Sequence, residues 1–129
     1  MFDSSIKILV VDDFSTMRKI VRNVLQQLGY SNIEEAENGE EALKKLREDH
    51  FDFVVSDWNM PVKDGLEMLK EIRSDANLKS LPVLMVTAEA EKSKVIEAIK
   101  AGVNNYIVKP FTAETMKQKI AQICERMKN

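Results

Sequence analysis

The chain has 129 residues, of which 44% are hydrophobic and 31% charged, and its formal net charge at pH 7 is -2. This composition is typical of a globular domain with a core and excludes a disordered chain, while the absence of a basic run argues against nucleic-acid binding. The longest apolar runs are only a few residues and the first residues do not resemble a signal peptide, so we expect a cytoplasmic protein without membrane insertion.

Apolar runs rich in β-branched residues alternate five times with stretches of helical spacing, which predicts five consecutive βα units. The first strand is expected at Ile8–Val11, and Ser15 is placed to cap the helix that follows it. The apolar face of this helix should carry Met17, Ile20, Val21, Val24, Leu25 and Leu28. Gly29 should end the helix in a left-handed conformation.

The second strand is expected near residues 32–35, and Asn38-Gly39 leads into a helix. The apolar residues of that helix are Ala42, Leu43 and Leu46. The third strand, Phe53–Ser56, runs into an unusually long loop that turns at Lys63-Asp64-Gly65. The helix after this loop should bury Leu66, Leu69 and Ile72. A loop of this length between a strand and a helix indicates a functional segment.

Pro82 opens the fourth strand, which ends at Thr87, and the connection from Thr87 to Glu91 leads to a helix over residues 92–101 that Gly102 ends. The fifth strand runs into Lys109-Pro110. The apolar residues of the final helix are Met116, Ile120, Ile123 and Met127. We find no linker, internal repeat or low-complexity segment, so we expect one domain over residues 1–129.

Near-continuous apolar strands that alternate with helices predict a parallel sheet covered on both faces and joined by right-handed crossovers. We therefore expect an α/β, doubly wound (βα)5 fold with a five-stranded parallel sheet in the order 2-1-3-4-5. Open sheets of this kind bind ligands beyond the carboxyl ends of their strands, at the point where the strand order reverses. In this order the crevice lies between the first and third strands, with Asp13 and Asp57 facing each other across it.

Four of the predicted strands end on polar residues suited to a phosphoryl group. The residues are Asp12, Asp13, Asp57, Thr87 and Lys109. Three carboxylates in one crevice repel each other unless a divalent cation is bound or a pKa is raised. Magnesium prefers oxygen ligands, and the backbone carbonyl of Asn59 is placed to add one. Taken alone, Asp13 could equally cap the first helix together with Ser15.

Asp57 is the best candidate nucleophile, since a carboxylate can form an acyl phosphate when a metal and a cation neutralise the incoming oxygens. Lys109 supplies that cation, and a cis bond to Pro110 would aim it inward. The hydroxyl of Thr87 can bond a phosphoryl oxygen, and Tyr106 could move into the space left behind it. Each of these roles also has a plain structural alternative: a strand-ending turn for Lys109, a strand end for Thr87 and a partly buried aromatic for Tyr106.

These motifs, Asp12-Asp13, Asp57, Thr87-Ala88 and Lys109-Pro110, resemble the receiver domains of two-component response regulators over the whole chain. Within that family, the stretches Leu9–Arg18, Ser56–Pro61 and Leu84–Ala90 are similar to those of the chemotaxis regulators. The resemblance implies a flavodoxin-like receiver fold over residues 1–129 with no effector domain, and we expect a monomer. It also implies an output by binding rather than by transcription or catalysis.

The resemblance further implies that Asp57 takes a phosphoryl group from a phosphohistidine on a sensor histidine kinase of the chemotaxis type, with intrinsic hydrolysis afterwards. The implied magnesium ligands are Asp12, Asp13, Asp57 and the Asn59 carbonyl. The implied phosphate-binding and switch residues are Thr87, Ala88, Tyr106 and Lys109. The implied target surface comprises Lys92, Val95, Ile99, Tyr106 and Lys119, and its expected partner is a flagellar motor switch protein. A dedicated phosphatase is left open.

Three other functions are alternatives to this one. An aspartate-nucleophile phosphatase normally carries its nucleophile after the first strand and a second acid two residues later, whereas here Asp57 follows the third strand and position 59 is Asn59. A flavin binder needs a glycine- and hydroxyl-rich phosphate loop where this chain has two acids. The third alternative is a relay protein that passes phosphate to another histidine protein. Only the resemblance favours motor binding over this function.

Cys124 and His50 are the only residues of their types. One cysteine excludes an internal disulfide and a cysteine-cluster metal site. A lone histidine among charged neighbours is usually solvated surface. We assign neither residue a function.

Overall fold

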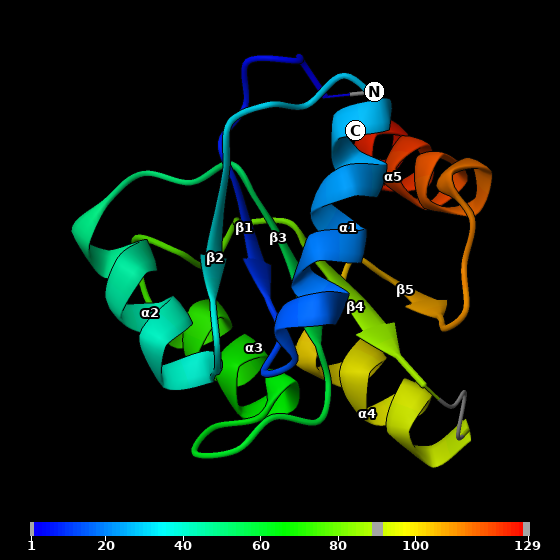
Figure 1. Cartoon of the computed structure of the whole chain (residues 1–129). Helices are drawn as coiled ribbons and strands as arrows, with labels where there is room; N and C mark the ends of the chain where they lie inside the picture. The colour runs from blue at the N-terminus through cyan, green and yellow to red at the C-terminus, as the bar shows by residue number, and fades with distance from the viewer. Residues whose placement is uncertain (1, 89–91, 128–129) are drawn as a thin grey trace.

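The computed structural model describes residues 2–88 and 92–127, and its centre is a five-stranded parallel sheet in the order β2-β1-β3-β4-β5 (Figure 1). The strands are β1 (Ile8–Val11), β2 (Ile33–Ala36), β3 (Phe53–Asp57), β4 (Val83–Thr87) and β5 (Asn105–Val108). The helices are α1 (Ser15–Gln27), α2 (Gly39–Glu48), α3 (Gly65–Ser74), α4 (Lys92–Ala101) and α5 (Ala113–Met127). The predicted fold class and strand order are confirmed.

Alternate residues of the strands point into two cores, one on each face of the sheet, as the period of a β-strand requires. On one face, α1 and α5 pack on strand residues Ile8, Val10, Val55, Leu84 and Val86. On the other face, α2, α3 and α4 pack on Leu9, Val11, Val54, Val83 and Met85. Because helices cover both faces, the carboxyl ends of the strands are the place where a sheet of this kind binds ligands.

Several helix ends follow the sequence signals. The Asn38 side chain accepts a hydrogen bond from the Glu41 N–H at 2.9 Å and so caps α2. Gly29 and Gly102 have φ angles of +100° and +94°, the left-handed conformation predicted for the residues that end α1 and α4. No described helix is both long and apolar enough to cross a membrane.

The start of α1 differs from the prediction, because Phe14 is the N-cap and no side chain caps the helix there. Ser15 is the first helical residue, so its predicted capping role is wrong. The Oδ1 atom of Asp12 accepts the N–H of Phe14 at 2.9 Å instead, so Asp12 shapes the turn out of β1. The turn between β1 and α1 is therefore controlled by a residue of the acidic motif.

Smaller differences concern element bounds and helix faces. The second strand begins at Ile33, one residue later than predicted. Ile20 and Met127 are 45% and 49% exposed, so their expected places on the apolar faces of α1 and α5 are wrong. Both side chains lie at the margin of their helix's buried stripe, because Val21 and Leu25 form the core of α1 and Met127 is the last residue of α5.

Candidate functional site

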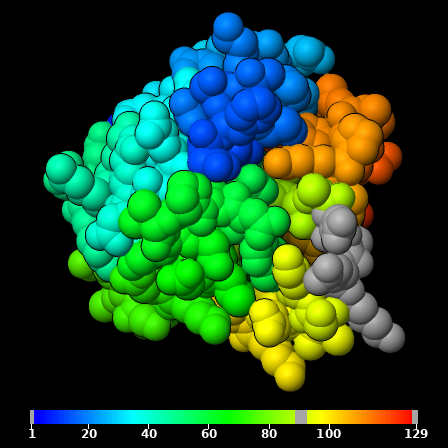
Figure 2. All heavy atoms as spheres, turned by 60° about the horizontal axis from the view of Figure 1, so that its bottom comes forward, coloured from blue at the N-terminus to red at the C-terminus, as the bar shows by residue number. Residues whose placement is uncertain are grey.

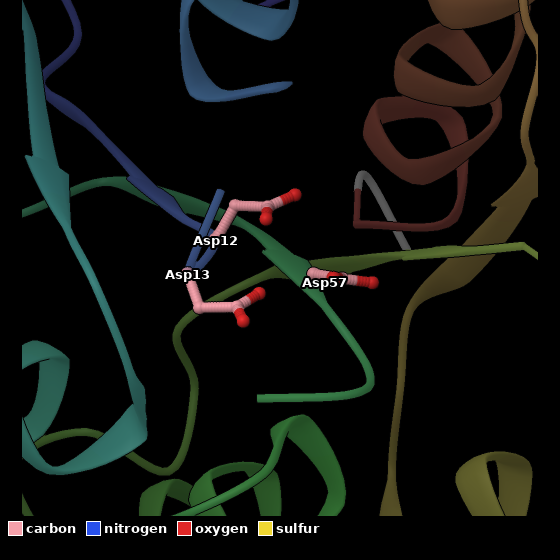
Figure 3. Close-up of side chains that lie close together, drawn as sticks. All are labelled: Asp12, Asp13 and Asp57. Atoms are coloured by element: carbon pink, nitrogen blue, oxygen red, sulfur yellow. The ribbon is translucent and has the colours of Figure 1, made fainter. Parts of the chain in front are cut away.

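Three aspartates meet at the carboxyl edge of the sheet, where β1 and β3 end (Figure 3). Asp12 and Asp13 directly follow β1, and Asp57 is the last residue of β3, which pairs with β1 so that Val11 lies beside Ser56. One carboxylate oxygen from each aspartate lies within 4.8 Å of those of the other two. Figure 2 shows the same face of the molecule, where the segments after β1, β3 and β5 surround this edge. The predicted convergence of carboxylates at one sheet edge is therefore present.

Asp12 is held from several sides and is only 3% exposed. Its N–H donates to the Ala36 carbonyl oxygen at 3.1 Å, and its Oδ2 lies 3.6 Å from the Lys109 Nζ. Burial raises the pKa of the Asp12 carboxyl, and the Asp57 charge raises it further. The Phe14 N–H and the Lys109 ammonium act in the opposite direction.

Asp57 has a side chain that is only 11% exposed. Burial raises the pKa of its carboxyl, although the Lys109 ammonium, 3.5 Å from Oδ1, and the Trp58 N–H, 2.7 Å from the same atom, oppose this effect. The Lys109 and Trp58 contacts of the Asp57 carboxylate are thus both made by Oδ1.

The donor set fits a hard divalent cation. The three carboxylates supply only oxygen ligands, the type that Mg²⁺ prefers, and in the described part of the chain they are the one group of acidic, histidine or cysteine side chains with such spacing. Asp13 is exposed, so an ion there could also keep water ligands. Asn59 lies in the exposed part of the loop after β3, two residues beyond Asp57.

Lys109 lies at the end of β5 and points its ammonium group at two of the carboxylates, Asp12 and Asp57. The peptide bond between Lys109 and Pro110 is cis, the isomer expected to aim Lys109 inward. The Lys109 N–H donates to the Thr87 carbonyl oxygen at 2.8 Å, so the ends of β4 and β5 are joined beside the site. Thr87 is buried, whereas Ala88 after it is exposed.

The loop between β3 and α3 is fixed by backbone contacts. The Gly65 N–H donates to the Trp58 carbonyl oxygen at 2.8 Å, and the Gly39 N–H donates to the Lys63 carbonyl oxygen at 3.0 Å. A Cβ atom on Gly65 would lie 2.5 Å from the Asp57 carbonyl oxygen, closer than such atoms approach. The start of α3 is therefore packed directly against the backbone of Asp57, which only glycine allows.

The predicted target surface is partly contiguous. Tyr106 is half-buried, and the Lys119 Nζ lies 5.3 Å from the centre of its ring. On α4, Ile99 is 60% exposed while Val95 is partly buried. Ile96 is 43% exposed but was not among the predicted surface residues, because the sequence argument rested on the pair Val95 and Ile99, one turn apart. The Lys92 side chain and the predicted connection over residues 89–91 lie outside the described residues.

Arg18 is a further residue at the site that the sequence did not predict. Its Nη1 donates to the Asp12 carbonyl oxygen at 2.6 Å, and its Nε donates to the Glu35 carboxylate at 3.0 Å. A signal was available, because an arginine one turn into the helix that follows an acidic strand end can reach back to that strand. Arg18 thus joins the acidic turn to β2.

Comparison with known proteins gives a consistent result. Residues 8–121 match the family model described as the response regulator receiver domain. The chain is 57% identical to the chemotaxis protein CheY-3 of Vibrio cholerae over 127 residues, 98% of each protein, and 56% identical to the chemotaxis protein CheY of Pseudomonas aeruginosa, covering 94% of this chain and 98% of that protein.

Solved structures agree with these sequence matches. The structure of the chemotaxis response regulator CheY4 of Vibrio cholerae superposes with a TM-score of 0.84 at 38% identity, covering 92% of this chain and 98% of that one. A putative response regulator from Chloroflexus aurantiacus superposes with a TM-score of 0.86 at 33% identity, covering 92% of this chain and 97% of that one. Both likenesses extend over almost the whole fold.

Proposed function

Because the chain belongs to the response regulator receiver domain family, we propose that it is a phosphoacceptor signalling protein in which Asp57 receives a phosphoryl group from a phosphohistidine of a sensor histidine kinase. Receiver domains are signalling proteins rather than classical enzymes. The observation that carries the proposal is the meeting of three carboxylates with the Lys109 ammonium at one sheet edge. We assign Asp57 as the acceptor because it ends β3 directly before the long loop and its Oδ1 lies 3.5 Å from the Lys109 Nζ.

Receiver domains typically bind Mg²⁺, and we assign its binding to the carboxylates of Asp12, Asp13 and Asp57 with the backbone carbonyl of Asn59. When bound, the ion neutralises charge on the acidic cluster and on the phosphoryl oxygens. The raised carboxyl pKa values of Asp12 and Asp57 agree with a site where buried negative charge awaits a cation.

The transfer step forms one bond and breaks one. An Asp57 carboxylate oxygen attacks the phosphorus, the P–O bond forms as the P–N bond of the phosphohistidine breaks, and the leaving imidazole keeps the electron pair and takes up a proton. Hydrolysis returns the carboxylate, because water attacks the phosphorus and the P–O bond to Asp57 breaks with release of inorganic phosphate. Lys109 stabilises the oxygens that carry the charge in both steps.

The switch follows from the new charge. The Thr87 hydroxyl and the Ala88 N–H bind phosphoryl oxygens, and the movement of Thr87 makes room for the half-buried Tyr106 to turn inward. Since Tyr106 packs beside Lys119 and against the core under α4, its rotation changes the surface of α4, β5 and α5. Phosphorylation at the sheet edge is thereby read on a separate face.

We place this protein in chemotaxis, with a flagellar motor switch protein as its target, on the strength of its similarity to chemotaxis proteins of two bacteria. The target surface comprises Lys92, Val95, Ile99, Tyr106 and Lys119. Two exposed isoleucines three residues apart on α4, Ile96 and Ile99, add apolar area that suits a helix of the partner.

The acceptor is tested with a small phosphodonor. With Mg²⁺ and acetyl phosphate, intact-mass measurement should show one added phosphoryl group on the wild type and none on Asp57→Asn. Asp49→Asn is the matched control, since Asp49 is an exposed aspartate at the opposite edge of the sheet and should label normally. Labelling of Asp57→Asn at the wild-type level rejects the assigned acceptor.

The output is tested by capture of partners on the phosphorylated and unphosphorylated protein. A flagellar switch protein retained only by the phosphorylated form supports the assignment, and Tyr106→Ala should weaken that capture without reducing labelling. Retention of a histidine phosphotransfer protein that drains the label identifies a relay intermediate instead.

A further inference from the structure

The geometry points to Arg18 as a positioning residue for the acidic site, because its side chain fixes the peptide group that orients Asp13. This inference rests on the proposed Mg²⁺ site and deepens it by naming what holds a ligand in place. Arg18 contacts neither the proposed ion nor the phosphoryl group, so its action is through the backbone of Asp12.

Asp13 is exposed, and its carboxylate direction depends on the two peptide groups on either side of it. In the peptide before it, the Asp12 carbonyl oxygen accepts a hydrogen bond from the Arg18 Nη1 at 2.6 Å. In the peptide after it, the Phe14 N–H donates to the Asp12 Oδ1 at 2.9 Å. Each flanking peptide plane is thus fixed by one hydrogen bond, and together they set the backbone angles of Asp13.

The two hydrogen bonds differ in how they respond to metal binding. The bond from Phe14 uses the Asp12 carboxylate, which is itself an assigned metal ligand and can be drawn toward the ion. The bond from Arg18 uses the Asp12 carbonyl oxygen, which is not an assigned metal ligand. Both bonds are charge-assisted, since the Arg18 bond has an ionised donor and the Phe14 bond an ionised acceptor, so the difference lies in which Asp12 atom each one uses. Arg18 is therefore the contact that keeps Asp13 oriented in both the free and the bound state.

Arg18 is itself held in place from β2. Its Nε donates to Oε1 of Glu35 at 3.0 Å, and only 13% of its side chain is exposed. Arg22, one helical turn later, binds the other Glu35 oxygen, Oε2, at 2.8 Å. A guanidinium group offers several donors in fixed directions, so Arg18 can bond the carboxylate of Glu35 and the carbonyl of Asp12 together.

Arg22 provides a matched control within the same network. It shares the Glu35 carboxylate with Arg18, lies on the same helix, and carries the same charge, but its contact in this network is with Glu35 alone. A general effect of removing charge or loosening α1 should appear in both Arg18→Gln and Arg22→Gln. An effect on Asp13 should appear only in Arg18→Gln.

The experiment compares the full-length wild type with these two variants. Trp58 fluorescence during Mg²⁺ titration gives the half-saturating concentration, which we expect to rise about 10-fold in Arg18→Gln, as for other groups that orient metal ligands, and less than about 2-fold in Arg22→Gln. In the metal-free proteins, the backbone amide signals of Asp13 and Phe14 should shift in NMR spectra of Arg18→Gln and stay in place in Arg22→Gln. Thermal unfolding measures any shared loss of stability.

The outcomes separate this inference from the proposed function. If the wild type gives no Mg²⁺ response, the proposed metal site fails. If the wild type responds and both variants bind Mg²⁺ equally, or the Asp13 amide signal does not move in Arg18→Gln, the positioning role of Arg18 is overturned. Should Arg18→Gln not fold, Arg18→Lys answers the question.

Arg18→Lys keeps the charge but replaces the fork of donors by one ammonium group, which cannot take the directions of both guanidinium bonds. We expect it to raise the half-saturating Mg²⁺ concentration and to shift the Asp13 amide signal. Wild-type values for both in Arg18→Lys contradict the inference.

Discussion

The two edges of the sheet hold the same residue type in opposite electrostatic conditions. At the carboxyl edge, the side chains of Asp12 and Asp57 are 4% and 11% exposed, and burial raises the pKa of both carboxyls. At the amino edge, the side chains of Asp49 and Asp52 are 58% and 36% exposed. Hydrogen bonds lower the pKa of both, from the Lys7 side chain to Asp49 and from the Lys7 N–H to Asp52.

This difference separates charges that support the fold from charges kept for binding. A carboxylate whose pKa is lowered stabilises the native state when ionised, whereas one whose pKa is raised costs stability when ionised. The carboxylates of the amino edge therefore stabilise the folded protein. The ionised carboxylates of the carboxyl edge lower the stability of the metal-free protein. Such an arrangement agrees with the proposed binding of a cation at the carboxyl edge.

The largest expected effect tests how closely the carboxyl edge is packed. Gly65→Ala should destabilise the protein by about 3 kcal/mol, since its Cβ would press on the Asp57 carbonyl oxygen. Gly29→Ala, where a Cβ meets nothing within 4 Å but φ is +100°, should cost only about 1 kcal/mol. Urea unfolding of both variants measures the difference. Equal losses would show that Asp57 is not held by this contact.

The next effect concerns charge directly. In the absence of Mg²⁺ at pH 7, Asp57→Asn should raise the free energy of unfolding by about 1 kcal/mol, because it removes a buried charge from an acidic cluster. Asp52→Asn should lower it by about 0.5 kcal/mol, because it weakens the bonds to Lys7 and His50. Chemical denaturation curves decide this. A destabilised Asp57→Asn would remove the contrast between the edges.

The stability differences of Asp57→Asn and Asp52→Asn from the wild type should also depend on pH, for opposite reasons. The pKa of Asp57 is raised in the native state, so the cost of its ionisation appears as pH rises through that pKa and is absent below the ordinary value for aspartate. The pKa of Asp52 is lowered, so its stabilisation is complete above the ordinary value and disappears as pH falls through the native value. Both differences from wild type should therefore shrink toward pH 3 in urea unfolding experiments, the Asp57→Asn gain beginning to shrink at the higher pH. An Asp57→Asn gain that grows on acidification would contradict the burial argument.

The smallest expected effect is at His50, which bonds Asp52 at 2.8 Å while its side chain is 82% exposed. His50→Ala should lower the free energy of unfolding by only about 0.3 kcal/mol, as is usual for exposed polar contacts, and leave the Mg²⁺ response unchanged. Fluorescence titration and thermal unfolding of this variant are sufficient. A weakened Mg²⁺ response would mean that the two edges are coupled.

The ends of the strands could be predicted from the sequence, whereas the contacts of individual side chains could not. The strand ends were predictable because four buried runs stop at polar residues, as Asp57 and Lys109 illustrate. The strand order, however, is the one by which receiver domains of the CheY type are known, so its confirmation follows from the resemblance. The predicted Ser15 cap was wrong because the helix begins one residue earlier: Asp12 accepts the Phe14 N–H, Phe14 is the N-cap and Ser15 is already helical.

Contacts between distant segments were beyond the sequence argument. Arg18 reads as an ordinary surface residue of an amphipathic helix until β2 places Glu35 beside it. The exposure of Ile96 depends on how α4 lies on the sheet, which helical spacing alone does not fix. Gly65 reads as a turn residue, and only the packed loop shows that a side chain there would meet the backbone of Asp57.

The most direct test of the central claim is chemical mapping of the phosphorylated residue. An acyl phosphate can be reduced by borohydride, which converts the modified aspartate to homoserine and leaves a permanent mark for peptide mass spectrometry. After treatment with Mg²⁺ and acetyl phosphate, we predict homoserine at position 57, and none when Mg²⁺ is removed by a chelator. Homoserine at a different aspartate, or equal conversion of Asp57 with and without Mg²⁺, would contradict the account.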